Sequence, residues 1–190
     1  MFALIFGLSF LANAQDAKSN QPKGYQFTDI KRLPATSVKD QARAGTCWSW
    51  SGISFFESEM IRMGKEPIDL SAMYIVRHAY SDKATKFVRL HGSMNFAVGG
   101  AFCDVMHVIK NYGIVPMDVY KGLNYGEPNH AFGEIDDVLA GYVNAVIKNS
   151  NKKLSTAWKK GFDGILDAYL GEEPEKFEYK GKEYTPRTFA

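Results

Sequence analysis

The chain has 190 residues, of which 45% are hydrophobic, and its 23 Lys and Arg against 21 Asp and Glu leave a net charge of +2. This is a globular composition, long enough for one hydrophobic core or for a core with an appendage. Because lysines and acids are interspersed, no strong positive field is expected. We therefore predict no nucleic-acid partner and no binding to an anionic membrane surface.

The N-terminus has the pattern of a secretory signal. Residues 2–11 are an apolar run, and Ala12-Asn13-Ala14 places small residues where a signal peptidase cuts. The run is shorter than the roughly 20 residues that span a bilayer, so stable membrane association is not expected. Residues 1–14 are therefore predicted to be a signal peptide that exports the protein to the periplasm or the exterior. No Lys or Arg precedes the run, and a cytoplasmic location is the alternative.

An extended segment and three helices are expected next. Residues 15–36 are assigned to the extended N-terminal segment. The helices are residues 47–63, ended by Gly64; residues 72–88, with Ser71 as N-cap; and residues 101–112, ended by Gly113. In each helix the apolar residues recur at helical spacing, so each is expected to bury one face.

The character of the chain changes at residue 132. Apolar residues recur at helical spacing over residues 135–147 and again over 158–169, with a polar link between them. This pattern predicts a helical hairpin. Residues 177–185 alternate around Lys180-Gly181 and predict a short β-hairpin, which Pro186 is expected to end.

The segment that carries chemistry is residues 41–48, QARAGTCW. A cysteine alone is more often a small buried hydrophobe. Here Cys47 is expected in the first turn of a helix, where the helix dipole and free N–H groups favour a thiolate. Gln41, six residues earlier, could donate a hydrogen bond to the oxyanion that forms when the thiolate attacks a carbonyl. Cys47 is therefore predicted to be a nucleophile and Gln41 its oxyanion donor.

Ordered matches beyond this segment identify a family. Gly45-Thr46-Cys47-Trp48 resembles the nucleophile segment of papain-like peptidases. Leu70-Ser71, Gly99-Gly100 and Tyr112-Gly113-Ile114 resemble, in order, the start of that family's second helix and the two ends of its third. The chain thus resembles the N-terminal lobe of a papain-fold cysteine peptidase, closest to the bleomycin hydrolase and bacterial aminopeptidase C branch.

Two features point to that branch. Ala44 and Ala97 stand where the papain lobe carries a disulfide, which relatives of bleomycin hydrolase lack. The predicted helical hairpin also resembles the extra helical segments of this branch. We therefore predict no structural disulfide.

The resemblance implies an α+β papain-like fold, with a helical lobe over residues 37–131. Residues 132–190 would be a helical insertion and β-hairpin that begin a truncated remainder, with the β-rich lobe largely missing. The resemblance also implies a cysteine peptidase, with aminopeptidase activity, that acts on a peptide substrate bound by Gly99, Gly100 and Trp48. A homo-oligomer is implied for the full-length form. No metal-ligand cluster or nucleotide motif is present in the sequence, so neither a metal nor another cofactor is expected.

The base of the reaction is not evident in the sequence. Papain-like enzymes place a histidine, oriented by an asparagine, about 130–150 residues after the cysteine. The histidines of this chain are His78, His91, His107 and His130, all closer to Cys47. Only His130, in an Asn-His-Ala context, is a weak candidate. We expect that the catalytic His and Asn are not present, that the chain is an N-terminal portion, and that it is inactive alone.

Two alternatives remain open. The chain could be a secreted, non-catalytic peptide-binding protein derived from a peptidase lobe, which the missing base motivates. It could also be a redox sensor that pairs Cys47 with Cys103. Otherwise Cys103 is expected to be structural, because it lacks a glutamine and a helix-start position.

Overall fold

The computed structural model describes residues 24, 25 and 27–190. The predicted signal peptide, residues 1–14, therefore lies outside the described residues and stays a prediction. The chain divides into two units, Met1–Arg32 and Leu33–Ala190. The described part of the first unit has no helix or strand, and all secondary structure of the described chain lies in the second unit.

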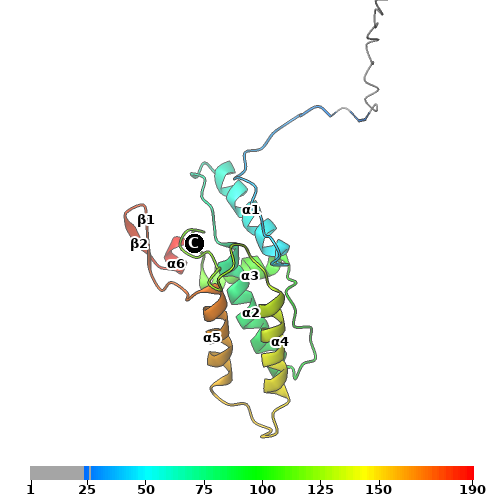
Figure 1. The fold of residues 1–190 in the computed structure, drawn as a ribbon. Helices are drawn as coiled ribbons and strands as arrows, with labels where there is room; N and C mark the ends of the chain where they lie inside the picture. The colour runs from blue at the N-terminus through cyan, green and yellow to red at the C-terminus, as the bar shows by residue number, and fades with distance from the viewer. Residues whose placement is uncertain (1–23, 26) are drawn as a thin grey trace, which may run out of the picture. The chain divides into compact units, whose positions relative to one another are not determined.

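The second unit contains six helices and one two-stranded sheet among its residues (Figure 1). They are α1 (Cys47–Arg62), α2 (Ala72–Arg89), α3 (Phe102–Tyr112), α4 (Gly133–Ile147), α5 (Trp158–Leu170), β1 (Phe177–Tyr179), β2 (Lys182–Tyr184) and α6 (Pro186–Phe189). The strands are antiparallel, with Phe177 opposite Tyr184. The predicted helices, the helical hairpin and the β-hairpin are thus confirmed. The segments 37–131 and 132–190 lie in one compact unit.

The start of α2 shows why the local prediction succeeded. Ser71 is the N-cap, and its Oγ accepts a hydrogen bond from the backbone N–H of Tyr74 at 3.0 Å. Pro186 ends the β-hairpin, as predicted, and also begins α6, which the sequence analysis did not predict. Thr185 caps that helix by accepting from the N–H of Thr188 at 3.2 Å, and proline fits the first helical position because its missing N–H would have no helical partner.

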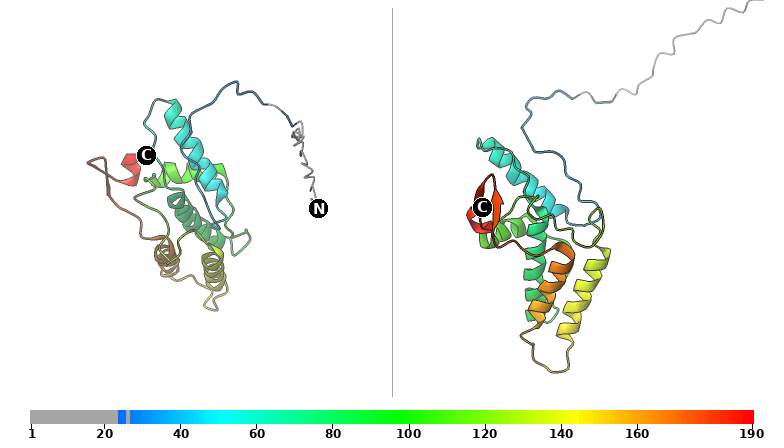
Figure 2. Two further views of the ribbon diagram at one scale, coloured as in Figure 1. Left: turned by 45° about the horizontal axis from the view of Figure 1, so that its top comes forward. Right: turned by 60° about the vertical axis from the view of Figure 1, so that its left-hand side comes forward.

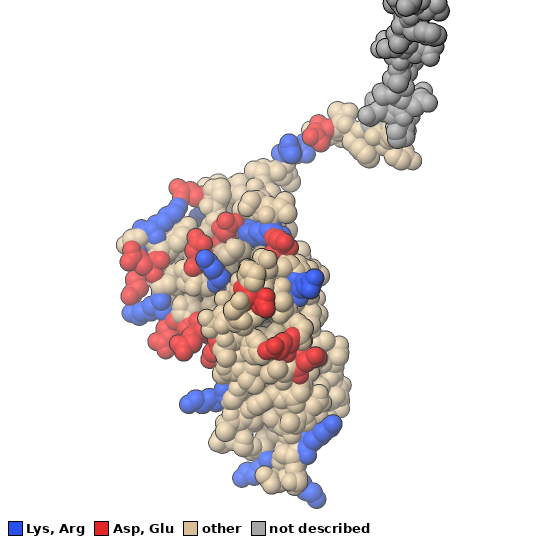
Figure 3. Space-filling model, in the orientation of Figure 1, with Lys and Arg blue, Asp and Glu red and all other residues tan. Residues whose placement is uncertain are grey.

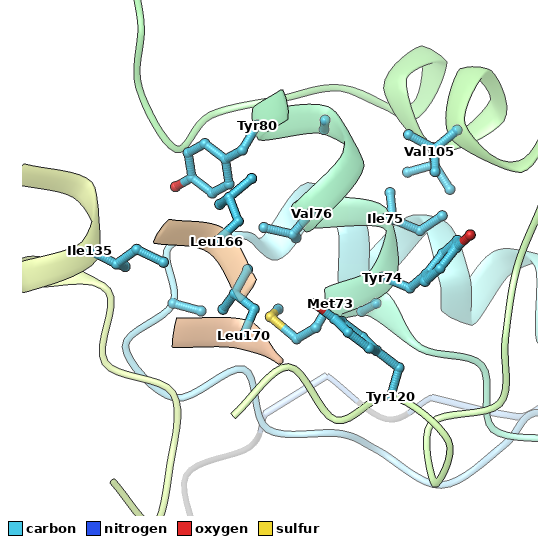
Figure 4. Packing of buried hydrophobic residues seen from close by; sticks show 14 of the residues in the cluster. Met73, Tyr74, Ile75, Val76, Tyr80, Val105, Tyr120, Ile135, Leu166 and Leu170 are labelled. Atoms are coloured by element: carbon cyan, nitrogen blue, oxygen red, sulfur yellow. The ribbon is translucent and has the colours of Figure 1, made fainter. Parts of the chain in front are cut away.

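The core is built around α2. This helix contacts α1, α3, α4 and α5, and Figure 4 shows its side chains meeting Ile135 of α4 and Leu166 of α5. Ile75 and Val76 are fully buried, and two thirds of the helix is buried in all. All nine residues from Ala72 to Tyr80 are buried, so the first half of α2 is surrounded by other elements. The exposed and half-buried residues of α2 lie in its second half, which holds Asp82, Lys83 and Lys86.

The hairpin of α4 and α5 covers one side of α2, as the two views in Figure 2 show. Leu139 and Val143 of α4, and Phe162 and Leu166 of α5, are fully buried in this layer. On the face drawn in Figure 3, positive and negative side chains are interspersed over most of the molecule. Within the described part of the chain, no helix combines the length and apolar character needed to cross a lipid bilayer.

A buried charged group joins α2 to the C-terminal side of α5. The Arg77 guanidinium, 7% exposed, binds the Asp167 carboxylate at 2.5 Å and also the Glu173 carboxylate. Breaking such a pair would leave an uncompensated charge in the interior. These contacts hold the hairpin against α2.

His78, next to Arg77, is buried and neutral. Its ring lies between Tyr74 and Tyr112, with centroids at 4.5 and 4.1 Å. Burial, aided by the positive charges of Arg77 and Lys159, lowers the pKa of His78 to about 3. The Glu173 carboxylate lies 3.6 Å from Nε2, but it is already bound by Arg77 and does not offset the burial.

We predict that acid destabilises the fold through His78. The unfolded chain protonates this imidazole near pH 6.5, whereas the folded chain resists protonation down to about pH 3. Stability is therefore lost as pH falls from 6.5 toward 3, by about 2 kcal/mol between pH 7 and pH 5. Urea unfolding at the two pH values measures the change. The His78→Phe protein should lack this part of the pH dependence; an equal slope in both proteins would contradict the assignment.

Candidate active site

Cys47 is the first residue of α1 and its side chain is exposed. Gly45 makes the turn into the helix with φ of +65°, and a Cβ at this position would come within 2.8 Å of Val98. Behind the turn, Thr46 is fully buried and its Oγ1 accepts a hydrogen bond from Trp50 Nε1 at 3.2 Å. The first N–H groups of a helix have no acceptor within it, and Cys47 stands at this end of α1.

Cys47 and Gln41 line one groove, of about 420 Å³. It will be called the Cys47 groove, and its remaining lining residues are Ala35, Thr36, Ser37, Val38, Lys39, Trp50, Ser51 and Ser54. Gln41 Oε1 is buried and has no hydrogen-bond partner among the described residues. The structure thus places Cys47 and Gln41, the residues predicted as nucleophile and oxyanion donor, along one groove, and the Gln41 amide is not engaged elsewhere in the described chain.

Residues 35–44 form a strap along this groove. Ala42 has φ of +49°, and its N–H donates to Asp40 Oδ1 at 2.7 Å. The backbone of Arg43 pairs with the segment around Ala131: its N–H donates to the His130 carbonyl at 2.9 Å, and its own carbonyl accepts from the N–H of Phe132 at 3.2 Å. These bonds fix the backbone on either side of Gln41.

A buried carboxylate anchors the strap to α1. Glu57 has a fully buried side chain, and its Oε2 accepts from Thr36 Oγ1 and from Lys39 Nζ, both at 2.5 Å. Its Oε1 accepts from the N–H of Leu70 at 2.8 Å. Burial opposes the charge of Lys39, but hydrogen bonds to Asp69 and Glu57 outweigh it and raise the pKa of the ammonium above its usual range.

Sequence analysis missed this network. One signal was available, because Glu57 follows Ile53 by four residues and so lies on the apolar face of α1. A carboxylate on a buried helix face needs charged or polar partners. Which partners it has depends on segments distant in the chain.

The predicted substrate-binding residues differ in exposure: the two glycines are exposed, whereas Trp48 is buried. Gly99 and Gly100 are exposed, and a Cβ on Gly99 would meet open space. A Cβ on Gly100 would come within 2.5 Å of the Trp48 indole. Trp48 itself is 9% exposed, and its Nε1 donates to the Val98 carbonyl at 2.9 Å. Trp48 therefore holds the glycine turn beside α1, and its contact with substrate stays a prediction.

No histidine lines the Cys47 groove. The ring of His130 packs edge-on against Trp50 at 5.8 Å and faces a different cavity, and burial lowers its pKa. His78 is buried behind α3, while His107 on α3 is paired with Asp82 at 3.1 Å. His91 lies in the exposed turn after α2.

The position of Cys103 differs from the prediction. It is the second residue of α3 and is exposed, so the idea that it is away from a helix start was wrong. Helix α3 begins at Phe102 because the Asp104 side chain accepts from the N–H of Ala101 at 2.8 Å. Both cysteines are free thiols. A redox role that pairs them stays a prediction.

Among the described residues, no three His, Cys, Asp or Glu side chains gather as metal ligands.

Comparison with known proteins adds three findings. The model of the papain family cysteine proteases matches residues 22–160. The "Cathepsin B-like CP2" of Giardia intestinalis is 28% identical over 92 residues, which are 43% of this chain and 31% of that protein. The crystal structure of PepW from Lactobacillus rhamnosis superposes with a TM-score of 0.56 at 20% identity, over 83% of this chain and 43% of PepW. The likeness to PepW shows a shared fold. The chain spans less than half the length of each relative.

We predict that Glu57→Gln lowers the free energy of unfolding by about 2–3 kcal/mol, because Lys39 then lacks a buried carboxylate partner. Glu59→Gln is the matched control on the same helix: this carboxylate pairs with Arg62 at the surface, and its loss should change stability little. Urea unfolding measures both variants. Equal effects of the two substitutions would contradict the anchoring role of Glu57.

Proposed function

Because this chain belongs to the papain family of cysteine proteases, we propose that it supplies the nucleophile and an oxyanion donor of a cysteine peptidase. Its fold is papain-like, and the regular structure of the described residues is helical apart from one small sheet. The observation that carries the proposal is the Cys47 groove. An exposed thiol at the first residue of a helix shares this groove with a glutamine that has no other partner in the described chain.

The proposed reaction proceeds through an acyl-enzyme. The Cys47 thiolate attacks the carbonyl carbon of a peptide bond, and the carbonyl oxygen becomes an oxyanion. Gln41 Nε2 and the backbone N–H of Cys47 donate hydrogen bonds to it. When the C–N bond breaks, the amine leaves with a proton and the acyl group remains on Sγ as a thioester. Water then hydrolyses the thioester and restores the thiol.

A base is needed to take the thiol proton and to return it to the leaving amine. Since no histidine lines the Cys47 groove, none of the four is proposed for this role. We infer that the chain by itself turns over peptides very slowly. Peptidase activity of the whole protein is therefore proposed for a form in which another segment brings an imidazole to Cys47.

Thiol labelling tests the nucleophile. A peptidyl epoxide at neutral pH is expected to alkylate Cys47 about tenfold faster than Cys103, because the groove holds the reagent beside the thiol. Both cysteines are exposed and both lie in the first turn of a helix, so Cys103 is an internal control. Mass analysis of the tryptic peptides gives the two rates.

The same measurement separates the two functional classes. Equal, slow labelling of both cysteines would favour the alternative, a non-catalytic peptide-binding protein, which the lack of a groove histidine also motivates. Cys103→Ser should leave the rate at Cys47 unchanged. A Cys103→Ser protein that loses labelling at Cys47 would point to a fold defect instead.

We also propose aminopeptidase specificity, with the N-terminal part of a peptide lying along Gly99 and Gly100. Support comes from the resemblance to the bleomycin hydrolase and aminopeptidase C branch. The alanines at positions 44 and 97, where papain has a disulfide, and the hairpin of α4 and α5 agree with that branch. Gly99 is exposed and a Cβ there would meet open space, although its carbonyl accepts a hydrogen bond from Lys83 Nζ.

Substrate blocking tests this specificity. The natively expressed protein should hydrolyse an aminoacyl coumarin amide but not its N-acetyl form, and Cys47→Ala should abolish turnover. Gln41→Ala should lower kcat by about 10²-fold with little change in KM, because its amide acts mainly on the transition state. Faster hydrolysis of the N-acetyl substrate would favour an endopeptidase. Full activity of Cys47→Ala would exclude the cysteine mechanism.

A further inference from the structure

A second cavity, of about 230 Å³, lies on the other side of the strap from the Cys47 groove. Alternate residues of the strap line the two spaces: Lys39 and Gln41 line the groove, whereas Asp40 and Ala42 line the second cavity. Trp50 borders both. The peptidase reaction proposed above uses no residue that belongs to the second cavity alone.

The floor of this cavity is apolar and firmly held. It includes Trp50, the fully buried Met73 and Tyr120, which is 4% exposed. The Tyr120 carbonyl accepts a hydrogen bond from Ser71 Oγ at 2.6 Å. A Cβ on Gly122 would come within 2.3 Å of Met73, so the chain packs closely there. The cavity is therefore preformed, as small-molecule sites usually are.

The rim carries charges without ion-pair partners. Asp40, Asp118 and Lys121 line the cavity, are exposed, and form no salt bridge within the described residues. His130 Nδ1, at the same cavity, is buried and lacks a hydrogen-bond partner in the described chain. Two carboxylates, one ammonium group and an unused imidazole nitrogen thus surround an apolar floor.

We propose that this cavity binds a small zwitterion, a free α-amino acid with an apolar side chain. Its ammonium group would face the carboxylates of Asp40 and Asp118, and its carboxylate would face Lys121. The apolar side chain would lie on Trp50 and Met73. The volume is below the roughly 300–1,000 Å³ of sites for drug-sized ligands, which suits a ligand of this size. The charge pattern is complementary to a zwitterion and not to an ion of one sign.

Binding at this site does not require the Cys47 thiol. The test is therefore made on the Cys47→Ala protein, so that its result is independent of the proposed peptidase activity. The protein is titrated by calorimetry with L-leucine, with leucinamide, which lacks the carboxylate, and with N-acetyl-leucine, which lacks the ammonium group. Leucine should bind saturably and about fivefold or more tightly than either analogue.

Rim variants locate the ligand. Lys121→Gln should weaken leucine binding about fivefold and leave leucinamide unaffected, whereas Asp118→Asn should weaken leucine and leave N-acetyl-leucine unaffected. Asp137→Asn and Lys148→Gln, exposed residues that do not line the cavity, are the matched controls and should change nothing. Tryptophan fluorescence should respond to leucine in the parent protein and lose that response in Trp50→Phe.

Four results would overturn the proposal. The first three are the lack of saturable leucine binding, equal affinity for leucine and both analogues, and binding that neither rim substitution alters. The fourth is a fluorescence response retained in Trp50→Phe, which would place the ligand elsewhere.

Discussion

The buried carboxylate of Glu57 joins the parts on which the candidate site depends. One of its oxygens accepts from Thr36 and Lys39 of the strap, and the other accepts from the backbone of Leu70, just before α2. A buried charge is tolerated only when its partners are all in place. Helix α1, the strap and the start of α2 are therefore assembled together, and the Cys47 groove, which the strap and α1 line, depends on that assembly.

The strap, residues 35–44, carries Gln41 and also separates two spaces in the structure. Its alternating side chains divide the space beside α1 into the Cys47 groove and the second cavity, with Trp50 between them. The backbone pairing of Arg43 with the segment around Ala131 holds the strap from the far side. His130 contributes to this pairing through its carbonyl, while its imidazole packs on Trp50 and lines the second cavity. His130 thus supports the strap without lining the Cys47 groove.

Local patterns were predictable because their causes are local. The apolar spacing of α3, the Ser71 cap and the β-hairpin around Lys180-Gly181 each depend on residues within a few positions, and the structure agrees with them. Pro186 ends the β-hairpin as predicted, and α6 begins there because Thr185 caps it. An expectation that failed concerns where α3 begins. Cys103 was expected away from a helix start, but the Asp104 cap places it in the first turn.

The sequence by itself determined the family, through ordered matches, and it predicted the chemistry from a cysteine at the start of a helix and a glutamine six residues earlier. Only the tertiary structure decided which residues from distant parts of the chain contact one another around the Cys47 groove. It paired Glu57 with Lys39, placed Trp48 on Gly100 and left no histidine in the lining of the Cys47 groove. The physical reason is that helix position and capping depend on adjacent residues, whereas the partner of a buried charge or ring comes from segments that meet only on folding.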